Sequence, residues 1–129
     1  METSQEDYIK YRLERAWKTF EDAKSLARLK SWNSSMNRLY YACFYAINAL
    51  FSKQNIQSHT HSGVKTQLSN HFVKTGILDK ESGMLYGDLF DLRQRGDYGD
   101  FNDIDEKEIV QLIPKVEEFL LKIQHLIKL

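Results

Sequence analysis

The sequence contains few of the residues that interrupt regular structure or cross-link a chain. Its 129 residues include one proline, six glycines and one cysteine. So few prolines and glycines argue against long irregular stretches. The single cysteine, Cys43, cannot form an internal disulfide, which fits a reducing compartment.

A charge excess and a membrane-length apolar run are also missing. Eighteen basic residues balance eighteen acidic ones, so a contact with RNA or DNA needs a local patch or pocket rather than an overall positive field. The longest apolar run, from Leu39 to Phe51, is interrupted at Asn48 and is shorter than the roughly 20 residues of a membrane-spanning helix. The first residues are polar where a signal peptide has its apolar region. We therefore expect a cytoplasmic protein with no membrane segment.

The apolar pattern is helical along the whole chain. Spacings of three and four residues predict helices over residues 5–30, 62–75, 79–95 and 105–127. Residues 35–53 are apolar nearly all round, as in a helix at the centre of a bundle. Gly96 and Gly99 should bracket a turn, and Pro114 should kink the last helix without breaking it. The sequence predicts an all-α fold: one antiparallel up-and-down bundle of four to five helices, forming a single domain over residues 1–129.

Arg38, Tyr41 and Tyr45 form the first candidate site. They are three and seven residues apart in the central helix and therefore share one face. An arginine in so apolar a helix is costly to bury without a partner. The pattern indicates a pocket for an anion such as phosphate. The alternative is an arginine paired with a carboxylate or with helix-terminal carbonyls, beside tyrosines that only pack.

A second candidate site lies at the end of the fourth helix, where Arg93, Arg95, Asp97 and Tyr98 surround Gly96. Two arginines and a tyrosine beside a glycine turn are suited to holding a phosphate and a base. Alternatively, the arginines only cap the helix, whose dipole favours cations at this end. Arg93 and Asp97 have the i, i+4 spacing of an ion pair.

His59 and His61 suggest a metal site, but zinc needs three or four ligands and only His71 is close in sequence. We therefore expect no metal and no cofactor, with His61 near a helix start. A glycine-rich phosphate loop, a nucleophile elbow and a zinc-protease motif are absent from the sequence.

The stretch SSMNRLYYACFYA, residues 34–46, resembles the core-helix signature of HEPN domains (higher eukaryotes and prokaryotes nucleotide-binding). The stretches THSGV, FVKTG and LRQRGDY, at residues 60–64, 72–76 and 92–98, follow in the order of the family. The resemblance covers residues 7–121. It implies a four- to five-helix bundle like the helical domain of kanamycin nucleotidyltransferase. It also implies a homodimer and a minimal nucleotidyltransferase partner in a toxin–antitoxin pair.

The resemblance also implies a candidate activity, since many members of this family are metal-independent ribonucleases, marked by an arginine and a histidine with four to six residues between them. Counted from Arg38, the expected histidine is Tyr45; five positions after Arg93 is Tyr98. A tyrosine has a pKa of about 10 against about 6.5 for histidine, so only about one in a thousand is ionised at neutral pH. The sequence therefore favours binding over cleavage, with Asp97 as a conceivable substitute base.

The leading hypothesis is a HEPN-type module that binds a nucleotide, RNA or a partner protein. Arg38 and Arg93 would contact the anion beside Arg95, and Tyr41, Tyr45 and Tyr98 would stack or donate hydrogen bonds. One alternative is a toxin-like endoribonuclease with catalytic candidates Arg93, Asp97 and Tyr98. The other is a structural dimer that restrains a nucleotidyltransferase. The binding hypothesis requires Arg38 and Arg93 to converge.

Overall fold

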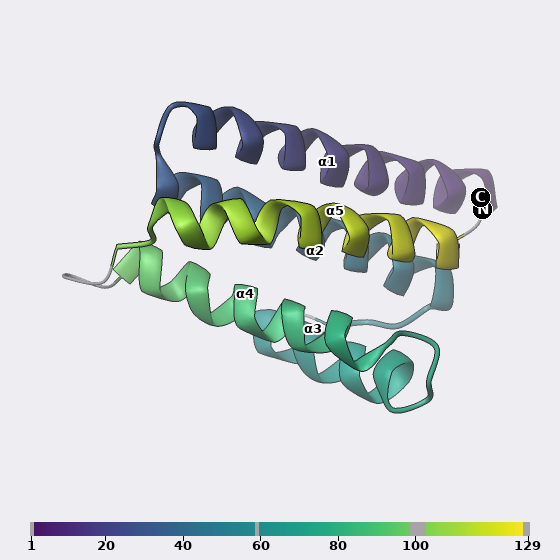
Figure 1. Ribbon diagram of the computed structural model, residues 1–129. Coiled ribbons are helices and arrows are strands. Elements are labelled where there is room, and N and C mark those ends of the chain that lie inside the picture. Colours follow the sequence, from purple (N-terminus) through teal and green to yellow (C-terminus); the bar gives the residue numbers. More distant parts are fainter. Residues whose placement is uncertain (1, 59, 99–102, 128–129) are drawn as a thin grey trace.

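The computed structural model describes residues 2–58, 60–98 and 103–127, with only the backbone of residues 2, 3 and 98. In this part of the chain the structure consists of five α-helices and one π-helical turn, as the sequence predicts for an all-α bundle (Figure 1). The elements in chain order are α1 (Glu2–Arg28), α2 (Trp32–Gln54), α3 (His61–Leu68), the π-helical turn η1 (Ser69–Val73), α4 (Lys80–Tyr98) and α5 (Glu106–Ile127).

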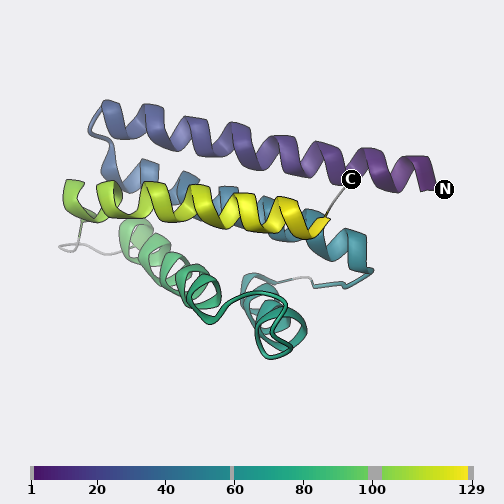
Figure 2. The same cartoon turned by 45° about the vertical axis from the view of Figure 1, so that its right-hand side comes forward.

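Helices α1 and α2 form a long antiparallel hairpin and make the most extensive contact in the molecule. Helix α5 packs against both of them, and α4 packs against α2 on another side. In both views α1 begins at the end of the bundle where α5 finishes (Figures 1 and 2). The short helices α3 and η1 lie beside α4, below the hairpin in Figure 1.

Helix α2 is the central helix, as its apolar sequence predicts. Eleven of its side chains are buried, and they face α1, α4 and α5. Burial of apolar surface stabilises the fold by about 25 cal/mol per Å² removed from water. With so many buried side chains, this helix contributes much of the stabilisation of the core. Its buried residues are Ser35, Met36, Leu39, Tyr40, Ala42, Cys43, Ala46, Ile47, Ala49, Leu50 and Phe51.

Helix α4 differs from the prediction, because it continues through Gly96 to Tyr98. The predicted turn is wrong for residues 96–98, and its remainder lies outside the described residues. Gly96 instead allows a close approach: a Cβ there would be 3.2 Å from Ile104 Cγ1 and 3.5 Å from Asn33 Oδ1. The start of α4 agrees with the prediction, since Asp79 Oδ2 accepts a hydrogen bond from the Ser82 amide at 3.0 Å.

Helix α5 is continuous through Pro114, so the predicted survival of the helix across the proline is confirmed. Proline removes the hydrogen bond to the carbonyl four residues earlier. That residue is Val110, which is exposed to solvent, and water can therefore satisfy its carbonyl. Among the described residues, no helix is both long and apolar enough to cross a bilayer.

Candidate functional site

Arg93 is the most buried arginine of the described residues, with only 9% of its surface exposed. Its guanidinium carbon lies 5.0 Å from the centroid of the Tyr40 ring and 5.7 Å from that of Tyr41. Its Nη1 is 3.6 Å from Asp97 Oδ2, a long ion pair. Its buried Nε, like that of Arg95, has no hydrogen-bond partner in the described structure. Since a buried donor without a partner is costly, Arg93 is suited to receive an acceptor from a ligand.

The side chain of Arg38 also contacts the Tyr41 ring and therefore belongs to the same group of residues. Its guanidinium carbon is 5.2 Å from the Tyr41 ring centroid, and its Nε and Nη2 donate to Asn37 Oδ1 at 3.1 and 2.8 Å. Asn37 Nδ2 donates to Asp97 Oδ2 at 3.4 Å. We call Asn37, Arg38, Tyr41, Arg93 and Asp97 the arginine cluster. It holds two guanidinium groups and one carboxylate.

The two arginines predicted from the sequence thus meet at one aromatic ring. They do so because α4 packs against α2, which brings the last turns of α4 beside the start of α2. The cations stack on an electron-rich ring face, an arrangement worth about 0.5–1 kcal/mol at exposed sites and more when desolvated. A net positive group lined by stacked rings is a surface for a phosphate or another anion.

His61 lies beside this cluster, although the sequence interpretation placed it only near a helix start. It is the first residue of α3, and its Nδ1 is 2.8 Å from the Tyr40 hydroxyl. The Tyr86 hydroxyl donates to Tyr40 at 3.1 Å. Tyr40 therefore donates its own hydrogen to His61 Nδ1, and we assign the imidazole proton to Nε2. This hydrogen-bonded relay joins α4, α2 and α3.

The environment of His61 favours a neutral imidazole. Partial burial lowers its pKa below the usual 6.5, and the positive charge of Arg93 lowers it further. Burial raises the pKa of Tyr40 and of Tyr86. Both phenols therefore stay protonated at neutral pH, and the relay ends in an Nε2–H donor.

Three of the predicted residues are not part of the arginine cluster. Tyr45 is next to it, with ring centroids 5.9 Å from Tyr41, but its hydroxyl accepts from Arg15 at 3.4 Å. Arg95 Nη2 donates to Glu108 of α5 at 2.6 and 2.5 Å. Residues two positions apart on a helix are separated by about 200° around its axis, so Arg95 points away from Arg93. The side chain of Tyr98 lies outside the described residues.

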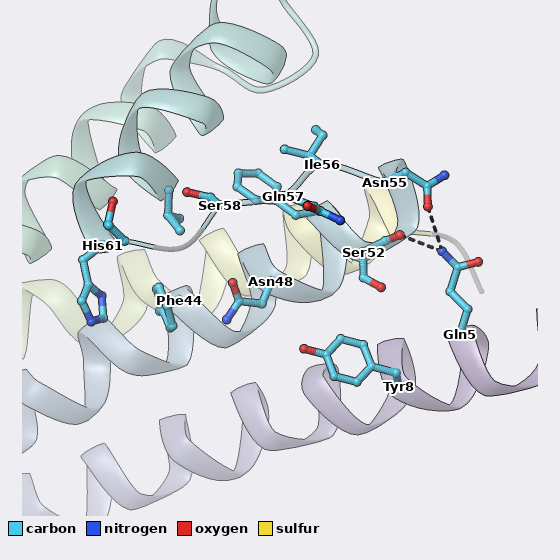
Figure 3. A pocket seen from close by; sticks show the side chains of 13 residues that line it. Gln5, Tyr8, Phe44, Asn48, Ser52, Asn55, Ile56, Gln57, Ser58 and His61 are labelled. Atoms are coloured by element: carbon cyan, nitrogen blue, oxygen red, sulfur yellow. Dashed lines mark hydrogen bonds between the residues drawn. The ribbon is translucent and has the colours of Figure 1, made fainter.

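His61 also lines a cavity of about 550 Å³. It lies between the first turns of α1, the second half of α2 and the segment after α2 (Figure 3). Phe44 forms part of its wall and lies 4.7 Å from the His61 ring, centroid to centroid. Among the side chains that the structure describes, none of Asp, Glu, Lys or Arg lines it. The cavity is lined by Gln5, Tyr8, Phe44, Asn48, Phe51, Ser52, Asn55, Ile56, Gln57, Ser58, Thr60, His61 and Val64.

The described residues contain no group of three or more His, Cys, Asp or Glu positioned to hold a metal ion. Cys43 is buried in the core, and burial raises the pKa of its thiol far above the usual range. Its sulfur is therefore a packing group rather than a nucleophile.

The fold and the site define an all-helical bundle in which two arginines, a histidine and several tyrosines lie close together. The HEPN domain model matches residues 9–126. The chain is 38% identical to a UPF0332 protein of Thermotoga maritima over 95% of this chain and 93% of the relative. It is 31% identical to "Putative toxin MJ0142" of Methanocaldococcus jannaschii, covering 85% and 75% respectively. The chain belongs to the HEPN domain family, as its sequence motifs indicated.

Proposed function

We propose that this HEPN-domain chain binds a nucleotide or RNA at the arginine cluster. Arg93 and Arg38 would contact a phosphate, and His61 Nε2–H would donate a further hydrogen bond. The observation that carries the proposal is the buried guanidinium of Arg93, whose Nε has no partner in the described structure. Hydrogen bonds from charged donors to phosphate are about twice as strong as neutral ones.

The cavity beside His61 supports a nucleotide rather than a free anion. Its volume is within the range of about 300–1,000 Å³ found for small-molecule sites. Its wall offers the Phe44 ring and the amides of Asn48, Asn55 and Gln57, and its described lining contains no acidic or basic side chain of Asp, Glu, Lys or Arg. An uncharged, planar base with hydrogen-bonding edges suits such a wall. His61 contacts both regions and would lie between base and phosphate.

Thermal unfolding with a panel of nucleotides and short RNAs tests this proposal. At 100 times Kd a ligand adds about 2.7 kcal/mol, which raises the Tm of a chain of this size by about 10 °C. In Arg93→Gln the affinity should fall about 10- to 150-fold, the loss of one charged hydrogen bond. Arg28→Gln, an exposed arginine in the last turn of α1, is the matched control. The absence of any shift in the wild-type protein would refute the proposal.

A second candidate is metal-independent cleavage of RNA, favoured by the position of a neutral histidine beside a buried arginine. A base must take the 2′-hydroxyl proton while the 2′-oxygen attacks phosphorus and the bond to the 5′-oxygen breaks; a cation stabilises the phosphorane. An imidazole is a far better proton acceptor at neutral pH than the phenol of a tyrosine. However, the hydrogen bond from Tyr40 to Nδ1 leaves the imidazole proton on Nε2. His61 Nε2 can therefore act as a base only in the other tautomer, in which Nδ1 carries the proton and donates to Tyr40.

His61→Gln separates the two candidates. Its side-chain amide keeps a donor for phosphate but has no basic nitrogen, so binding should be weakened only modestly. RNA incubated with excess chelator should be cleaved by the wild-type protein and not by His61→Gln if the chain is a ribonuclease. Intact RNA with measurable binding in both proteins supports binding alone.

The chain is further proposed to act as a homodimer with a nucleotidyltransferase partner in a toxin–antitoxin-like pair. The support is membership of the HEPN family and the name of the Methanocaldococcus jannaschii relative, which describes it as a toxin candidate. A small nucleotidyltransferase encoded in the adjacent reading frame should copurify with this chain when both are expressed together. Sedimentation of the purified chain as a monomer would contradict the dimer.

A further inference from the structure

Four side chains of α1 form an ordered row with Tyr45 of α2. Arg12 Nε donates to the Tyr8 hydroxyl at 2.9 Å, and Arg15 Nη1 donates to the Tyr11 hydroxyl at 3.0 Å. The guanidinium carbons of Arg12 and Arg15 lie 5.7 and 4.7 Å from the Tyr45 ring centroid. We call Tyr8, Tyr11, Arg12, Arg15 and Tyr45 the tyrosine–arginine ladder.

Three residues of the ladder, Tyr8, Tyr11 and Arg15, are exposed to solvent, and Arg12 and Tyr45 are partly exposed. Tyr8 and Tyr11 are 42% and 52% exposed, although both are large aromatic residues. Neither Arg12 nor Arg15 forms an ion pair with a carboxylate of the described residues. Glu14, which is near them in sequence, lines the hollow between α1 and α5 instead. The ladder is therefore a local positive surface on a chain with no net charge.

The hydrogen bonds to tyrosine hydroxyls hold the guanidinium groups in place before any ligand arrives. The arginine side chains lose less conformational entropy on binding when they are ordered beforehand. Each guanidinium also keeps N–H groups that make no hydrogen bond among the described residues. Arginine planes and aromatic rings are the surfaces on which unpaired bases stack.

The ladder is continuous with the candidate site at both ends. Tyr45 is 5.9 Å from Tyr41 of the arginine cluster, and Tyr8 lines the cavity next to Gln5 (Figure 3). From Tyr8 to Arg15 the ladder extends about 10 Å along α1. A ligand that fills the cluster and the cavity can therefore continue onto α1.

We propose that the tyrosine–arginine ladder binds single-stranded RNA, so that the ligand is a strand of several nucleotides rather than a mononucleotide. This inference rests on the proposed binding function and identifies its substrate class. The ladder takes the phosphates and bases that flank the nucleotide held at the arginine cluster. A protein partner is less suited, because its acidic groups would have to match a surface that leads directly to the phosphate site.

The test compares a dinucleotide with an octanucleotide of uridine, measured by fluorescence anisotropy at several salt concentrations. In the wild-type protein the octanucleotide should bind more tightly. Arg12→Gln/Arg15→Gln should abolish that advantage and leave the affinity for the dinucleotide unchanged. Each lost phosphate contact to a single strand lowers the salt slope by about 0.7, so the double variant should lose about 1.4. Tyr11→Leu, which keeps both charges, should weaken octanucleotide binding roughly 5- to 150-fold.

The control is Lys10→Gln/Arg28→Gln, which removes two exposed positive charges of α1 outside the ladder. Circular dichroism establishes that each variant is folded. Equal affinity of wild type and ladder variants for the octanucleotide, with dinucleotide binding intact, overturns this inference alone. Failure of both oligonucleotides to bind the wild-type protein refutes the proposed function as well. A ladder variant that changes only the oligomeric state assigns the surface to a protein contact and also overturns the inference.

Discussion

The relay from Tyr86 through Tyr40 to His61 makes a quantitative prediction for Tyr40→Phe. Both tyrosines are completely buried, at 0% exposure. Removal of the Tyr40 hydroxyl leaves the Tyr86 hydroxyl in the core without its acceptor, which costs about 1–3 kcal/mol. His61 is partly exposed, so water can replace its lost donor. The ring volume is retained, and no cavity term is added. The free energy of unfolding should therefore fall by about 2 kcal/mol.

The double variant Tyr40→Phe/Tyr86→Phe gives the sharper result. Replacing both partners by apolar groups of the same shape is nearly neutral, so the second substitution should restore much of the stability lost in the first. Urea unfolding followed by circular dichroism measures the free energies, and a loss of 2 kcal/mol corresponds to about 7 °C in Tm. Tyr45→Phe, whose hydroxyl is near the surface, should change stability by less than about 0.5 kcal/mol. A double variant as unstable as the sum of the two singles would refute the relay.

Two further predictions concern titration and capping. Asp79→Ala should destabilise the protein by about 1 kcal/mol. Hydrogen bonds from the Ser82 hydroxyl and from Lys122 lower the pKa of the Asp79 carboxyl to about 2. The stability it contributes should therefore disappear as pH falls from about 4 to about 2, in wild type but not in Asp79→Ala. Because the pKa of His61 is lower in the folded protein than its usual 6.5, this histidine takes up a proton at higher pH in the unfolded chain than in the folded one. Stability should decrease as pH falls through about 6.5 by more in wild type than in His61→Gln, measured by urea unfolding.

The helices were predictable because their apolar spacing is regular and because α2 is apolar nearly all round. The end of α4 was not, since a glycine near a helix end has two uses that look alike in a sequence. Gly96 serves close packing against Ile104 and Asn33, whereas Gly76, with φ of 80°, does adopt the left-handed conformation that ends a helical segment.

The candidate site was partly predictable from the sequence. Arg38, Tyr41 and Arg93 lie in two helices whose packing brings them together. Arg38 stood out as a charged residue in an apolar helix, and Arg93 as one of two arginines beside a glycine. The separation of Arg95 from Arg93 follows from helix geometry alone, because neighbours two positions apart face opposite sides. The ladder was missed because Tyr8, Tyr11, Arg12 and Arg15 look like ordinary exposed helix residues until Tyr45 is placed beside them.

His61 could not be found by counting from either arginine, because its position depends on packing between helices. It is 32 residues before Arg93 in the chain, yet Tyr40 contacts both of them. The spacing of an arginine and a histidine along one helix is only one way to bring a cation and an imidazole together. A histidine at the start of α3 provides another, with Tyr40 fixing its tautomer.

Tyr40 therefore couples the site to the core. Its ring is buried in α2, its hydroxyl bonds to residues of α3 and α4, and the guanidinium of Arg93 lies over its face. A shift of α4 relative to α2 would move Arg93 and Tyr86 together and would turn the His61 ring through Tyr40. Binding of an anion between Arg93 and His61 should consequently stabilise the packing of α3 and α4 on α2. The helices that would hold the proposed ligand are therefore the ones that the ligand would stabilise.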